Sequence, residues 1–85
     1  MHQIHTVTAF AAVVAMNLKQ RFGHHLRTLR NDRQITQSQL AEACGTSVET
    51  ISNIERGIHG PRLELQGDIA AALNIPLYQL FTFDN

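Results

Sequence analysis

The segment from Thr36 to Gly57, TQSQLAEACGTSVETISNIERG, constrains the fold of this chain more than any other stretch of its 85 residues. Thr36 and Gln39 have the spacing of a capping box, which marks the start of a helix. Gly45 can take the positive φ angle that ends a helix in a sharp turn. Ser47 can then cap a second short helix that runs to the end of the segment. The segment therefore predicts two short helices joined by a tight turn.

The rest of the sequence predicts an all-α fold. Apolar residues recur three and four positions apart and never alternate over the length of a strand. The second short helix begins after Ser47, or alternatively after Thr46 with Glu49 closing the cap. Three further helices are expected over residues 17–33, 63–73 and 76–81. These five helices would form one small domain.

Composition limits where the chain works and what it binds. The single cysteine, Cys44, excludes a disulfide framework and fits a reducing, cytoplasmic environment. Residues 1–33 carry five basic side chains and one acidic side chain, whereas residues 34–85 carry two basic and six acidic ones, and the net charge is zero. We therefore expect a polarised molecule with one basic face and only weak affinity for phosphates in general.

The first fifteen residues, MHQIHTVTAFAAVVA, differ from the domain expected over residues 16–85. Their apolar run is too short to span a bilayer, and no basic segment precedes it as in a secretory signal. Either the segment is an incorrectly assigned extension that precedes a true start at Met16, or it is an apolar helix. We favour the helix, which would seek a partner chain because so small a domain cannot bury it.

The second short helix has one polar face. If Ile51 and Ile54 point inward, the helical period turns a donor-rich set outward. That set is Glu49, Ser52, Asn53 and Arg56, with Val48 at its edge. A helix with such a face is suited to the major groove of DNA.

These motifs resemble the lambda-repressor-like, or XRE-family, helix-turn-helix domain. The match covers residues 22–81 and is carried by LRTLR, TQSQLAEACGTS, TISNIERG and IAAALNIP. Members of the family fold as five helices and usually regulate transcription as two-fold dimers on palindromic operators. The resemblance implies that Gln37 holds a phosphate and that Arg30 pairs with Glu55. It also implies that bases are met by Val48, Glu49 and Asn53, with Thr50 and Ser52 nearby.

Side-chain chemistry gives each base-reading residue a role. Asn53 can bond adenine N6 and N7, Val48 can touch a thymine methyl group, and Glu49 can accept a hydrogen bond from cytosine N4. The DNA backbone would be held by Arg56, His59 and Arg62, around the loop after the helix. The predicted DNA-binding set is Gln37, Ser47, Val48, Glu49, Thr50, Ser52, Asn53, Arg56, His59 and Arg62.

The sequence thus predicts a homodimeric transcriptional regulator, a repressor or an activator, that binds double-stranded DNA. The alternative is an antitoxin or another module that binds a protein partner, with DNA binding secondary. The dimer contact is expected at Leu77, Leu80 and Phe81, with or without the amino-terminal segment. We expect no enzymatic activity, no cofactor and no metal, since His2 and His5 lack further ligands.

Overall fold

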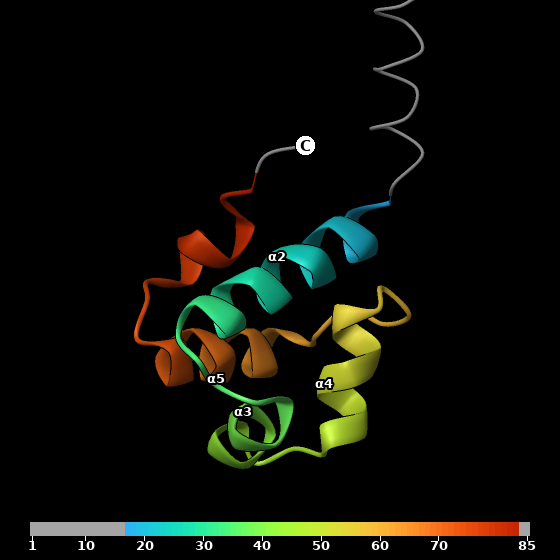
Figure 1. Ribbon diagram of the computed structural model, residues 1–85. Coiled ribbons are helices and arrows are strands. Elements are labelled where there is room, and N and C mark those ends of the chain that lie inside the picture. The colour runs from blue at the N-terminus through green and yellow to red at the C-terminus, as the bar shows by residue number, and fades with distance from the viewer. Residues whose placement is uncertain (1–16, 84–85) are drawn as a thin grey trace, which may run out of the picture.

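The computed structural model describes residues 17–83, which form four α-helices and one 3-10 helix (Figure 1). The elements are α2 (Leu18–Asp32), α3 (Gln37–Cys44), α4 (Val48–Glu55), α5 (Leu63–Leu73) and η1 (Leu77–Phe81). No strand occurs in this range, so the all-α prediction is confirmed. The fifth helix, predicted over residues 76–81, is present at Leu77–Phe81 but is a 3-10 helix and not an α-helix. The segment after Pro76 is only five residues long, and short pieces of this kind commonly take the tighter 3-10 form.

Side-chain caps set where the helices begin. The Thr36 hydroxyl accepts a hydrogen bond from the Gln39 backbone N–H at 3.0 Å, and the Gln39 side chain accepts one from the Thr36 N–H at 2.9 Å. The Ser47 side chain accepts from the Thr50 backbone N–H, so the alternative cap one residue earlier is not used. A second capping box, with Asn17 as the cap residue, begins α2.

Residues in the left-handed backbone conformation, with positive φ, follow the ends of α3, α4 and α5. Gly45 ends α3 with φ of 66°, and Gly57 follows α4 with φ of 77°. Asn74 ends α5 with φ of 57°, a conformation that asparagine tolerates better than most residues. Gln34, in the α2–α3 loop, also has a positive φ, of 56°, which the sequence did not indicate.

The core is a single cluster to which every element contributes. α4 packs against α2 and α3, while α5 packs against α3 and η1, and η1 also contacts α2. Figure 1 shows α4 standing at one side of the domain, with α3 beside one end of it. The buried apolar side chains are Phe22, Leu26, Leu29, Leu40, Ala41, Ile51, Ile54, Ile69, Ala70, Leu73 and Leu80.

The last member of that cluster corrects one prediction. Leu80 is 1% exposed, so its expected place in a dimer surface is wrong: its side chain completes the domain's own core. The His25 Nε2 atom and the Gln79 carbonyl oxygen lie 2.9 Å apart, and the Phe22 and Phe81 rings lie 5.2 Å apart. η1 is therefore fastened to α2 on its inner side.

Gly23 allows α2 and α4 to approach closely. It is buried in α2, and a Cβ atom there would lie 2.7 Å from the Glu55 carbonyl oxygen and closer still to that of Ile54. Real Cβ atoms essentially never approach an oxygen so closely, and these atoms belong to the backbone of α4. Because Gly23 has no side chain, the backbones of α2 and α4 can come this close.

The predictions for residues 1–15 fall outside the described range, which starts at residue 17. Within that range, the helices are too short or too polar to cross a membrane. The same residues contain no group of three or more histidine, cysteine, aspartate or glutamate side chains arranged to hold a metal ion.

Candidate nucleic-acid interface

α4 buries one face and leaves the opposite face open. Ile51 and Ile54 are 0% and 1% exposed, and Glu55 beside them is also buried. The opposite side carries side chains that are exposed or half-buried, and we call this set the outer face of α4: Val48, Glu49, Ser52, Asn53 and Arg56. The core therefore holds the helix firmly while its polar side chains stay accessible.

An open groove of approximately 360 Å³ runs beside this face. Glu49 and Asn53 of α4 line it together with His59 and Arg62 of the following loop. The Asn53 carbonyl oxygen accepts hydrogen bonds from the backbone N–H groups of Ile58, at 2.9 Å, and His59, at 3.4 Å. These bonds fix the loop to α4, so the side chains of His59 and Arg62 stay beside the outer face.

Two of the sequence-predicted residues also serve the helix itself. The Ser47 hydroxyl lies 2.8 Å from the Thr50 hydroxyl and accepts the Thr50 backbone N–H at 3.1 Å. Ser47 is exposed and Thr50 is half-buried. Both residues stand at the first turn of α4, where the cap fixes the direction of the hydroxyl groups.

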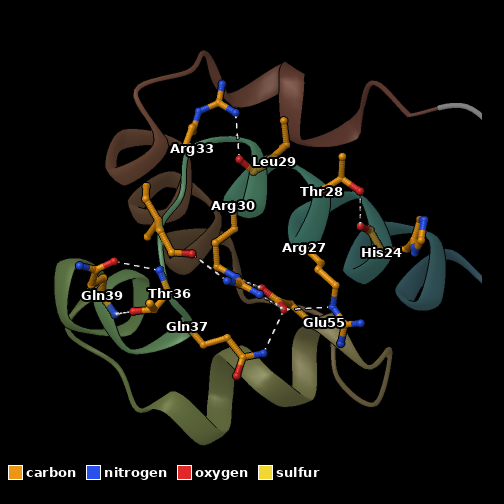
Figure 2. Close-up of polar contacts among 11 residues, drawn as sticks. His24, Arg27, Thr28, Leu29, Arg30, Arg33, Thr36, Gln37, Gln39 and Glu55 are labelled. Atoms are coloured by element: carbon orange, nitrogen blue, oxygen red, sulfur yellow. Dashed lines mark hydrogen bonds and ion pairs between the residues drawn. The ribbon is translucent and has the colours of Figure 1, made fainter.

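Behind the outer face lies a buried carboxylate. The Glu55 side chain is 0% exposed, and Arg30 of α2 donates to both of its oxygens (Figure 2). The Arg30 Nε–Oε2 distance is 2.6 Å and the Nη2–Oε1 distance is 3.0 Å. Arg30 Nη1 also donates to the Ile35 carbonyl oxygen at 2.7 Å. This pair therefore ties α4 to α2 and to the α2–α3 loop.

Two more side chains reach the same carboxylate. Gln37 Nε2 donates to Glu55 Oε1 at 3.0 Å, and Arg27 Nε lies 3.5 Å from the same oxygen. Gln37 was expected to face a phosphate, and in this structure one of its N–H groups faces Glu55. Arg27 is not among the residues predicted for the site, although its position three residues before Arg30 on α2 places both on one side of the helix.

The carboxylate has a perturbed pKa. Burial by itself would raise the pKa of Glu55. Hydrogen bonds from Arg30 and Gln37, with the charges of Arg30 and Arg27, outweigh burial and hold that pKa below its ordinary value. Glu55 is therefore an anion at neutral pH, matched by cations around it.

The expected basic face is smaller than the sequence count suggested. Arg33 donates from Nε to the Leu73 carbonyl oxygen at 3.1 Å, and the Arg21 guanidinium lies 5.3 Å from the centre of the Phe83 ring. With Arg30 bound to Glu55 and Arg27 beside the same carboxylate, four of the five basic side chains expected on that face have partners within the domain. Lys19 and Arg27 remain exposed.

Comparison with known proteins agrees with this arrangement. The family model of the helix-turn-helix domain matches residues 21–78. The chain is 43% identical over 58 residues to the HTH-type transcriptional repressor RghR of Bacillus subtilis, covering 67% of this chain and 43% of the relative. It is 37% identical over 60 residues to an uncharacterised HTH-type transcriptional regulator of Archaeoglobus fulgidus, covering 71% and 86%. The chain thus spans less than half the length of the Bacillus relative.

Solved structures show the same architecture. The restriction-modification controller protein C.AhdI from Aeromonas hydrophila superposes with a TM-score of 0.72 at 32% identity, covering 74% of this chain and 96% of the controller. The clp gene regulator ClgR from Corynebacterium glutamicum gives 0.74 at 31% identity, covering 76% and 69%. The two curated relatives are named as a transcriptional repressor and a transcriptional regulator, and the two solved structures as a controller protein and a gene regulator. This chain belongs to the helix-turn-helix family, in its lambda-repressor-like form.

Proposed function

We propose that this chain binds operator DNA as a transcriptional regulator, with α4 lying in the major groove. The observation that carries the proposal is the outer face of α4, where polar side chains stay accessible on a helix fixed by its buried face. The Archaeoglobus relative that matches most of this fold is named as a transcriptional regulator, and the matching Aeromonas structure as a restriction-modification controller. The proposed activity therefore needs binding alone, without catalysis.

Three side chains of the outer face would read bases. Asn53 offers the paired donor and acceptor that match adenine N6 and N7. Val48, 43% exposed at the first turn, offers methyl groups to a thymine. Glu49 accepts from cytosine N4 but repels phosphates, so it would discriminate between sequences without adding general affinity.

Cations and donors around α4 would hold the DNA backbone. Arg56, His59 and Arg62 are exposed at and after the end of α4, and His59 and Arg62 line the groove beside it. Gln37, at the first turn of α3, would donate its remaining N–H to a phosphate. Such contacts orient a protein on the duplex without carrying sequence information.

We further propose a two-fold homodimer formed through the outward side of η1. Leu77 is 44% exposed and Tyr78 is 71% exposed, and Phe81, although its ring packs on Phe22, remains 43% exposed. Large apolar side chains gathered on one short element are typical of a contact surface. A two-fold contact would repeat α4 on neighbouring turns of the duplex, about 34 Å apart.

Selection of bound sequences from random double-stranded DNA tests this function directly. A homodimer that reads bases should enrich two inverted half-sites with centres about one helical turn apart. A variant with Val48, Glu49 and Asn53 all changed to alanine is the matched control and should lose the enrichment while it stays folded. Absence of any retained DNA at low salt would refute the proposal and favour the protein-binding alternative.

A further inference from the structure

The outer face of α4 has two edges that differ in what flanks them. At about 100° per residue, Ser52 lies about 60° and Asn53 about 160° around the helix from Glu55. The Asn53 edge is flanked by the groove with His59 and Arg62. The Glu55 edge, beside Ser52, faces α2 and the start of α3. A helix lying in the major groove has a phosphate strand along each edge.

Three donors converge on one oxygen at the Glu55 edge. Arg30 Nη2 and Gln37 Nε2 each lie 3.0 Å from Glu55 Oε1, and Arg27 Nε lies 3.5 Å from it (Figure 2). Figure 2 shows Arg27 and Gln37 reaching this carboxylate from α2 and from the start of α3. Two guanidinium groups against one carboxylate leave one positive charge in excess.

The excess charge is accessible. The Arg30 side chain is only 11% exposed and already binds both carboxylate oxygens, whereas the Arg27 side chain is 51% exposed. Arg27 is therefore not needed to neutralise Glu55. The Arg27–Glu55 ion pair contributes little to the stability of the fold, because the Arg27 side chain is exposed to solvent. Gln37 uses one of its two amide N–H groups on Glu55 and keeps the other.

We propose that Arg27 and Gln37 together bind one DNA phosphate at the Glu55 edge of α4. The proposal rests on the proposed DNA-binding function and adds Arg27 to the Gln37 contact, so that both side chains meet one phosphate opposite the His59–Arg62 loop. Glu55 holds both side chains before DNA arrives, so little conformational entropy remains to be lost on binding. Arg27 supplies the charge and Gln37 a neutral donor.

The test is the salt dependence of binding. Affinity of the full chain for a random-sequence duplex, and for a selected operator once known, is measured between 50 and 200 mM salt, about the range over which counterion release is strong. The variants are Arg27→Ala, Gln37→Ala and their combination. Arg21→Gln is the matched control, since it removes one charge from the same helix at a residue that faces Phe83. Circular dichroism verifies that each variant is folded under the binding conditions.

Arg27→Ala should weaken binding equally on all sequences and reduce the slope of log K against log salt by about 0.9, the loss of one phosphate contact. Gln37→Ala should weaken binding with the slope unchanged, and the double variant should lose less than the sum of both. A wild-type slope for Arg27→Ala, or one changed no more than by Arg21→Gln, overturns the proposal. If the affinity loss of the double variant equals the sum of the two single losses, Arg27 and Gln37 do not share one phosphate. If the wild-type chain binds no duplex even at low salt, the DNA-binding function itself fails.

Discussion

Gly23 of α2 lies against the backbone of Glu55 in α4, so close that a Cβ atom would come within 2.7 Å of the Glu55 carbonyl oxygen. The helix that carries the outer face is thus positioned from behind by a residue without a side chain. The Arg30–Glu55 ion pair joins the same two helices at nearly the same point. The orientation of α4 is therefore set by two features: the close approach of the α2 and α4 backbones at Gly23, and the buried Arg30–Glu55 ion pair.

Gly23→Ala should lower the free energy of unfolding by about 1–3 kcal/mol, because the added methyl group has backbone atoms in its way and forces α2 and α4 apart. Urea denaturation followed by circular dichroism measures this change. An unchanged unfolding midpoint would show that the helices can separate at no cost, against the close contact described above.

Gly67→Ala is the matched substitution with the opposite expected sign. Gly67 lies within α5, is exposed, and would have nothing within 4 Å of an added Cβ. Alanine restricts the unfolded chain and favours the helix, so stability should rise by about 0.5–1 kcal/mol. A loss of stability in the same urea measurement would contradict the open space at this position.

Acid should remove part of the stability through Glu55. A carboxyl group whose pKa is lower in the folded state stabilises the fold above its unfolded pKa. That contribution disappears as the pH falls from about 4.5, the ordinary value, through the lower folded pKa. Unfolding free energies of wild type and Glu55→Gln, measured from pH 7 to pH 3, should therefore converge towards low pH. Glu64→Gln, at an exposed glutamate, is the control, and a gap that stays constant with pH would rule out the pKa as its source.

Asn53→Ala should relax the preference for one base pair in each half-site, at a cost of about 1–3 kcal/mol on the preferred sequence. Arg62→Ala, by contrast, should weaken binding to all sequences alike and flatten the salt dependence. Titrations of both variants on the operator and on random DNA separate these roles. Equal losses on both DNAs for Asn53→Ala would exclude base reading by this residue.

Leu77→Glu should convert the dimer to a monomer, because it places a charge within the exposed apolar side of η1. Sedimentation velocity at micromolar concentration measures the change. Leu63→Glu is the matched control, since Leu63 is also an exposed leucine but belongs to α5. A wild-type chain that sediments as a monomer would exclude the proposed dimer.

Sequence reasoning was most accurate where one residue decides the local structure. The caps at Thr36 and Ser47, and the left-handed ends at Gly45 and Asn74, depend on chemistry within three or four residues, and all four formed as predicted. α5 was predicted over residues 63–73 and is found there because Asn74 marks its end clearly.

Features that depend on distant parts of the chain were not predictable in this way. Leu80 looks like one of several apolar residues near the end of the sequence, and only the packing of η1 against α2 shows that it is buried. From the sequence, Gly23 is only a poor helix former within a helical pattern. The fold shows that the α4 backbone lies against it and leaves no room for a side chain. Arg27 likewise becomes distinct from the other arginines only when Glu55 lies beside it.

Within residues 17–83, none of the hydrogen bonds and ion pairs found involves the side chain of Val48, Glu49 or Asn53. Asn53 contributes only its backbone carbonyl group, which binds the following loop. The residues that fix α4 and the residues that would read DNA are thus separate sets. Under the proposed function, duplicated copies of such a gene would diverge in operator preference by changing these three positions while the fold keeps its stability. Selection on target choice and selection on folding would then act on different parts of the same eight-residue helix.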